Sequence, residues 1–100
     1  MHVQSRDDTQ AMIRARMDHL DLITRVLGCE SDIDRGRLLD VSPKTISRAR
    51  TGYVGGVFVA NVLASLRQHE RALAARNLRA TFDDLFEVVV VAKTDVDVTE

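Results

Sequence analysis

Residues 38–52 constrain the fold of this chain most, because they combine a helix end, a tight turn and the start of a second short helix. The segment reads Leu-Leu-Asp-Val-Ser-Pro-Lys-Thr-Ile-Ser-Arg-Ala-Arg-Thr-Gly. Ser42 is a residue type that caps helix N-termini, and Pro43 fits the first helical position because that position needs no N–H donor. Gly52 can adopt the left-handed conformation that ends a helix. The sequence therefore predicts a helix over residues 43–51.

The predicted helix has one narrow apolar face and a broad polar face. Ile46 and Ala49 are three residues apart and fall on the same side. Lys44 and Arg48, four residues apart, share one outer face among hydroxyl side chains. A short helix with this surface is typical of an element that enters a nucleic-acid groove. The alternative is an ordinary helical corner in a small bundle, because such corners also occur without DNA.

The charge distribution supports the nucleic-acid interpretation, although the net charge of the 100-residue chain is only −1. Residues 35–52 carry five cations against one acid, and residues 53–82 carry four against one. The flanking segments, 1–34 and 83–100, are acidic. Local positive potential, rather than net charge, attracts a polyanion. Twelve of the fourteen cations are Arg, the better bidentate partner of phosphate and guanine.

Helical periodicity extends over most of the remaining chain. Residues 7–27 carry apolar side chains at steps of three and four, which predicts a long first helix ending at Gly28. Ser31 and Asp34 predict a capped second helix that ends near residue 40. The other expected elements are a loop over 53–56, a fourth helix from about 57 that can continue to about 77, and a short capped helix over 81–86 with Phe82, Leu85 and Phe86 in the core.

The period changes after residue 86. Residues 87–93 are rich in valine and too short to favour a helix, so a strand is predicted. A lone strand in a helical chain would leave its backbone edges unpaired, and we expect the same strand of a second copy to pair with it, antiparallel across a two-fold axis. The alternatives are a hairpin with residues 94–99 and a disordered tail. The expected dimerisation residues are Val88, Val89, Val90 and Val91.

Residues 38–52 resemble the lambda-repressor-like helix-turn-helix family, the Cro/cI or XRE-type regulators. The family pattern is Leu-Leu-Gly-Val-Ser-Pro-x-Thr-Ile-Ser-Arg, then an apolar residue, a charged pair and Gly. The resemblance implies a mainly α, about five-helix DNA-binding domain at 1–87 with its motif at about 31–52. A C-terminal strand or tail at 88–100 would then pair across a dimer.

The chain departs from the family pattern at three places. The turn carries Asp40 where Gly is usual, and Arg35 stands where an apolar residue is usual, so this arginine must extend to the surface or reorient. The usual Thr-Gln opening is replaced by Ser31-Asp32. Gly36 matches the small residue expected inside the first motif helix, where it would allow close approach of another helix.

The resemblance implies that the helix over 43–51 lies in the major groove of double-stranded DNA. Its implied base contacts are Lys44 and Arg48, with Thr45 sharing base or phosphate contacts. The expected phosphate contacts are Ser42, Ser47, Thr51, Arg50, Arg37, Tyr53 and Gly56. A plain turn is the alternative for the Tyr53–Gly56 segment, and solvated side chains are the alternative for the two arginines.

Other functional classes have little support in the sequence. The three histidines share no metal spacing with each other or with Cys29, and neither a nucleophile elbow nor a glycine-rich phosphate loop is present. We therefore expect no enzymatic activity, cofactor, metal, small-molecule ligand or membrane segment, and a cytoplasmic location. The expected function is a homodimeric, sequence-specific transcriptional regulator that binds a roughly palindromic operator. The alternative is an antitoxin-like or anti-repressor protein-interaction module that uses the acidic C-terminal strand.

Overall fold

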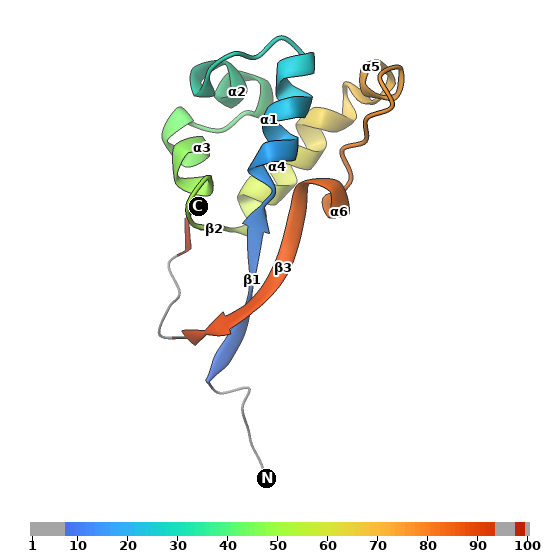
Figure 1. The fold of residues 1–100 in the computed structure, drawn as a ribbon. Coiled ribbons are helices and arrows are strands. Elements are labelled where there is room, and N and C mark those ends of the chain that lie inside the picture. The colour runs from blue at the N-terminus through green and yellow to red at the C-terminus, as the bar shows by residue number, and fades with distance from the viewer. Residues whose placement is uncertain (1–7, 94–97, 100) are drawn as a thin grey trace.

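The computed structural model describes residues 8–93 and 98–99, and it is mainly helical with one small β-sheet (Figure 1). The helices gather at one end of the molecule, and a two-stranded ribbon extends away from them. In chain order, the elements are β1 (Thr9–Ala15), α1 (Met17–Val26), α2 (Asp32–Leu39), α3 (Pro43–Ala49), β2 (Tyr53–Val54), α4 (Gly56–Arg67), α5 (Glu70–Ala74), α6 (Phe82–Leu85), β3 (Phe86–Ala92) and β4 (Val98–Thr99).

The sheet has the strand order β3-β1-β2-β4. β1 is antiparallel to β3 over its whole length, from Thr9 opposite Ala92 to Ala15 opposite Phe86. On its other edge β1 meets β2, where Ile13 lies opposite Val54. β4 pairs with β2 in parallel. The sheet therefore joins the start of the chain, the segment after α3 and both strands near the C-terminus.

The prediction of one helix over residues 7–27 is wrong in its first half. Thr9–Ala15 form strand β1, and α1 begins only at Met17. The spacing of Ile13, Met17 and Leu20 fits a helix, but β1 also matches the valine strand β3 along seven paired residues. Pairing with this distant strand overrides the local periodicity, as tertiary context often does.

The predicted C-terminal strand is confirmed, but the expectation that it lacks a partner within the chain is wrong. β3 pairs with β1 rather than standing alone. The alternative of a hairpin with residues 94–99 is contradicted for the described residues of that segment, because Val98 and Thr99 pair with β2. Residues 94–97 lie outside the described residues.

The buried core joins the helices to the base of the ribbon. Phe86, the first residue of β3, packs edge-on against Phe58 of α4 with ring centroids 6.2 Å apart. It also lies against Phe82 of α6, at 5.4 Å. Thr81 and Asp84 cap α6 reciprocally, as the sequence predicts. Leu85 and Phe86 are buried and Phe82 is half-buried, so the core role predicted for these three residues is confirmed.

Two further boundaries differ from the sequence prediction. The segment 53–56 is not a plain loop, because Tyr53–Val54 form β2 and Gly56 opens α4. The fourth helix does not continue to residue 77, because α4 ends at Arg67 and a separate short helix, α5, follows. Buried Leu73 anchors α5 to the core.

Candidate nucleic-acid interface

The α2–α3 corner begins with a capped helix. The Ser31 hydroxyl accepts a hydrogen bond from the Asp34 backbone N–H at 3.1 Å, which confirms the predicted cap of α2. α2 ends at Asp40, whose backbone is left-handed with φ 60° and ψ 44°. Aspartate tolerates this conformation better than most residues, so it can replace the usual glycine here.

Gly36 allows the turn to pack closely on α2. A Cβ atom added at this position would lie 2.5 Å from the Val41 carbonyl oxygen and 3.3 Å from the Pro43 nitrogen. The backbone N–H of Val41 donates to the Gly36 carbonyl at 3.0 Å. The predicted need for a small residue at Gly36 is thus met, because the close neighbours are the turn carbonyl of Val41 and Pro43, the first residue of α3.

The start of α3 follows the sequence prediction, and its end differs. The Ser42 hydroxyl accepts from the Thr45 backbone N–H at 3.1 Å, with Pro43 in the first turn. The helix ends at Ala49 rather than at residue 51. Gly52 does not take the expected left-handed conformation, because Gly28 is the one described glycine with a positive φ. Instead the Gly52 N–H donates to the Arg48 carbonyl at 2.9 Å.

The two faces of α3 are sharply different. Ile46 and Ala49 are buried in the core, with 0% and 1% of their surface exposed. Lys44, Ser47 and Arg48 are exposed on the opposite side. Within residues 8–93, neither Lys44 nor Arg48 has an ion pair or a side-chain hydrogen bond. Two cations are therefore available to an external anion on this helix.

The predicted phosphate contacts are distributed around the corner with different exposure. Two of the hydroxyls belong to the cap of α3, where the Ser42 and Thr45 side-chain oxygens lie 2.8 Å apart. Tyr53 and Thr45 are half-buried. The other exposed members of the predicted set, besides Lys44 and Arg48, are Arg37, Ser42, Ser47, Thr51 and Gly56, together with Arg50, whose side chain is only 31% exposed.

Arg50 has a structural role that the sequence did not predict. Its Nη1 lies 2.7 Å from Asp21 Oδ2 on α1, and its Nη2 lies 2.6 Å from Asp32 Oδ1 on α2. Further bonds run from Nη2 to Asp21 Oδ1 at 3.0 Å and from Nε to Asp32 Oδ2 at 3.3 Å. Most of its donors are thus used within the chain. Arg50 thus bridges α1, α2 and the end of α3, and the phosphate contact expected of it stays a prediction.

Arg35 completes the same cluster from inside. Only 7% of this residue is exposed, so the expected extension to the surface does not occur. Its Nε donates to Thr24 Oγ1 at 2.9 Å, and its Nη1 donates to Asp32 Oδ1 at 3.1 Å. Asp21 Oδ1 lies 3.3 Å from the same Nε. A buried arginine is stable only when carboxylates and hydroxyls satisfy it, as they do here.

The cluster also shifts the protonation equilibria of its members. Hydrogen bonds from Arg50 lower the pKa of Asp32 below its ordinary value, and Arg35 adds to the effect. The carboxylates of Asp21 and Asp32 raise the pKa of Arg50. We call Asp21, Asp32, Arg35 and Arg50 the corner ion cluster. Its one signal in the sequence is Arg35, which stands where the helix-turn-helix pattern that the corner resembles has an apolar residue.

A further cation that the sequence did not predict, Arg14, lies over Tyr53, which follows α3. The Arg14 guanidinium carbon is 5.3 Å from the centre of the Tyr53 ring, and its Nη2 is 3.5 Å from the tyrosine hydroxyl. β1 and β2 bring these residues together, with Ile13 opposite Val54 one position away. Because the sequence placed residue 14 inside a helix, this pair could not be foreseen.

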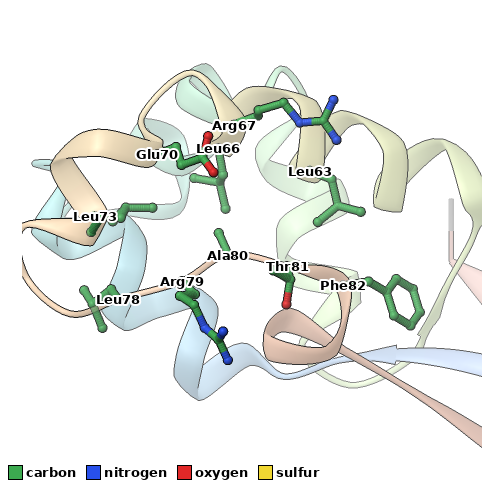
Figure 2. A pocket seen from close by; sticks show the side chains of 11 residues that line it. Leu63, Leu66, Arg67, Glu70, Leu73, Leu78, Arg79, Ala80, Thr81 and Phe82 are labelled. Atoms are coloured by element: carbon green, nitrogen blue, oxygen red, sulfur yellow. The ribbon is translucent and has the colours of Figure 1, made fainter.

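A cavity of about 480 Å³ lies between α4, α5 and the segment that leads to α6 (Figure 2). None of its lining residues belongs to α2 or α3. Its lining includes residues on both sides of the break between α4 and α5, a break that the sequence prediction missed. Leucines dominate its interior, and the side chain of Arg79 points away from them. The lining residues are Leu63, Leu66, Arg67, Glu70, Leu73, Ala74, Leu78, Arg79, Ala80, Thr81 and Phe82.

The part of the chain that the structure describes contains no cluster of three potential metal ligands. No helix in that part is long and apolar enough to cross a membrane.

No family model, no curated protein and no solved structure matches this chain in sequence or fold comparisons.

Proposed function

We propose that this protein is a sequence-specific DNA-binding transcriptional regulator, repressor-like or Cro-like, in which α2 and α3 act as a helix-turn-helix. The observation that carries the proposal is the exposed face of α3. There Lys44 and Arg48 have no charged partner among the described residues, while Ile46 and Ala49 hold the opposite face in the core. A cationic helix of this kind matches the demands of the major groove.

In this proposal α3 lies in the major groove with Lys44 and Arg48 directed at base edges. A bidentate contact between an arginine and guanine contributes about 1–3 kcal/mol of discrimination. Thr45 lies beside the Ser42 cap and contributes to base or phosphate contacts. Arg37, Ser47 and Thr51 would bind phosphates and fix the register of the helix.

The first turn of α4 supplies a further phosphate contact in this proposal. Gly55 is the N-cap of α4 and has no side-chain oxygen, and exposed Gly56 begins the helix. The first backbone N–H groups of the helix are therefore open to an external acceptor. Such groups, together with the helix dipole, favour an anion.

The corner ion cluster gives the proposed interface its rigidity. Arg50 follows α3 and bonds to carboxylates on α1 and α2. A recognition helix held at a fixed angle loses less conformational freedom on binding, which improves affinity. The cluster therefore supports DNA binding indirectly, by orienting α3.

The proposed regulator acts as a homodimer. Two copies of α3 would enter successive major grooves about 34 Å apart, on a roughly palindromic operator. Occupancy of such a site can regulate transcription without catalysis, ligand or cofactor.

Selection of bound sequences from a random DNA library, followed by fluorescence anisotropy on the selected site, tests the proposal. Arg48→Ala is expected to weaken operator binding about 5- to 150-fold, in line with the loss of one base contact. Arg76→Ala is the matched control, because Arg76 is also exposed but lies beyond α5. Equal affinity of the Arg48→Ala variant and the wild type, or a flat response to salt, would sink the proposal.

The alternative function, an antitoxin-like or anti-repressor partner, gains support from one observation. β3 is at the edge of the sheet, so another protein could add a strand to it. The acidic C-terminal strand itself is a weaker candidate, because Val98 and Thr99 already pair with β2. Co-purification with a different protein, together with failure to select any DNA sequence, would favour this alternative.

A further inference from the structure

The backbone of β3 has one paired edge and one open edge. The Lys93 N–H donates to the Asp8 carbonyl at 3.0 Å, and the Arg16 N–H donates to the Leu85 carbonyl at 2.7 Å. Because hydrogen bonding alternates along an antiparallel pair, odd-numbered residues of β3 face β1. The N–H and C=O groups of Phe86, Val88, Val90 and Ala92 therefore point to the other edge. No described residue pairs with that edge.

The side chains along the open edge are apolar and exposed. Val88 is 59% exposed and Val90 is 70% exposed, far more than a buried core strand would leave them. Their neighbours on the same face of the ribbon, Ala11 and Ala92, are also exposed. Natural edge strands are usually protected by charges, prolines or bulges. β3 carries one charge, Glu87, which alternation places on the other face, so the exposed face has none of these protections. An open edge with an uncharged, exposed face calls for a partner strand.

We propose that β3 pairs antiparallel with β3 of a second copy, with Val88 opposite Val90 around a two-fold axis at Val89. The inference deepens the proposed function and rests on it only for the biological role of the dimer. Pairing within the chain excludes the simplest version of the dimer, in which β3 has no other partner. A dimer is still compatible with the fold when it uses the edge of β3 that faces away from β1.

The register follows from symmetry and from strand length. A two-fold axis at Val89 pairs all seven residues of β3, from Phe86 opposite Ala92 to Ala92 opposite Phe86. It also brings every outward-pointing backbone group opposite an outward-pointing group of the partner. An axis at Val88 or Val90 would leave two residues at one end of each strand unpaired. The register centred on Val89 is therefore the most complete.

The dimer would join two four-stranded sheets into one continuous sheet. The exposed valines of the two copies, Val88 and Val90 of each, would form one apolar cluster. Val89 and Val91 are half-buried on the other face of the ribbon. Of the four valines predicted for dimerisation, two thus contribute exposed side chains, while the other two direct their backbone groups to β1.

Cysteine cross-linking tests the register directly. In a Cys29→Ala background, Val89→Cys is expected to form a disulfide-linked dimer under mild oxidation. Residues opposite each other in a non-hydrogen-bonded pair have Cα atoms about 4.5 Å apart, which a disulfide can bridge. Val88→Cys and Val90→Cys are the controls, because each would lie more than about 7 Å from its own symmetry mate. Cross-linking at position 88 or 90 but not at 89 would overturn the register.

Light scattering tests the interface itself. Wild type is expected to be a dimer, and Val90→Lys and Val90→Pro are expected to be monomers. Proline at position 90 removes an outward N–H and leaves the β1 pairing intact. Ile33→Lys is the matched control, because Ile33 is 56% exposed on α2, and it should remain dimeric. Circular dichroism checks that each variant is folded.

The outcomes separate this inference from the proposed function. A monomeric wild type that still binds a selected DNA site would overturn the β3 dimer alone. A folded Val90→Pro variant that stays dimeric would do the same. A β3-linked dimer with no DNA preference would support the interface and overturn the proposed function.

Discussion

Arg50 and Asp21 are 29 residues apart in sequence and form a two-point ion pair, with the arginine Nη1 2.7 Å from Asp21 Oδ2 and its Nη2 3.0 Å from Asp21 Oδ1. The pair ties the residue after α3 to α1. Asp32 shares the same guanidinium, so three helices meet at one side chain. The orientation of α3 therefore depends on charged residues as well as on the apolar core.

Arg50→Ala is expected to lower the free energy of unfolding by about 1–2 kcal/mol, because two partly exposed carboxylates lose a charged hydrogen-bond partner. Urea denaturation measures the change. Arg37→Ala is the control, since Arg37 is exposed and has no ion pair among the described residues. Arg50→Lys should recover only part of the loss, because lysine lacks the planar fork. If Arg50→Ala reduced the salt dependence of DNA binding and left stability unchanged, Arg50 would be a phosphate contact after all.

The protein is expected to lose stability in acid. The folded-state pKa of Asp32 is lowered by Arg50, and that of Asp84 is lowered by the hydroxyl and N–H of Thr81. A carboxyl group with a lowered folded pKa stabilises the fold above its unfolded value, about 3.9, and loses that contribution as the pH falls through the folded pKa. Urea unfolding at a series of pH values should show a decline below about pH 4.

Asp32→Asn provides the control for the acid prediction. The variant should be less stable than wild type at neutral pH, because the amide is a weaker partner for Arg50 and Arg35. It should also show a shallower decline in acid. An unchanged pH profile would mean that Asp32 does not contribute to the acid sensitivity.

Gly36→Ala is expected to destabilise the fold by about 1–3 kcal/mol, although alanine is normally the better helix former. The added Cβ would lie 2.5 Å from the Val41 carbonyl oxygen, so the turn would have to shift. Thermal unfolding measures the loss, and operator binding should weaken with it. Gly56→Ala is the control for stability, because nothing lies within 4 Å of its added Cβ. A Gly36→Ala variant with the stability of the wild type would show that the turn can shift without cost.

Arg14→Gln tests whether the proposed DNA surface continues from α3 onto β1. The Arg14 guanidinium lies over Tyr53, a predicted phosphate contact, so we expect weaker binding and a salt slope reduced by about one. The loss of affinity should be similar for specific and random DNA, because contacts to phosphates carry no sequence information. Arg71→Gln on α5 is the control. If the salt dependence of binding were unchanged, Arg14 would not contact DNA, and its role would be the contact with Tyr53.

Local signals predicted several elements accurately because their causes lie within a few residues. The caps at Ser31, Ser42 and Thr81 satisfy backbone groups of their own helices, so the starts of α2, α3 and α6 could be placed. The valine run of β3 is β-branched throughout and was correctly assigned to a strand. Asp40 takes the left-handed conformation that the usual glycine would, a compatibility that its short polar side chain allows.

Sequence patterns did not predict the contacts between distant segments. β1 is a strand because β3 lies beside it more than 70 residues later, and its own periodicity also fits a helix. The partners of Arg50 lie on α1 and α2, so its position beside the predicted recognition helix suggested a phosphate contact instead. The break after α4 was also missed, and Leu73 of α5 is buried beyond it and lines the cavity.

The α2–α3 corner can be read from local residues alone, because capping, the Ser-Pro start and the alternation of apolar and cationic positions act over three or four residues. The folded arrangement was needed to learn which arginines hold the fold, which remain available to an anion, and which edge of the valine strand stays open. Those outcomes depend on charges and backbone groups brought together from distant segments, and their pairing energies arise only once the chain has folded.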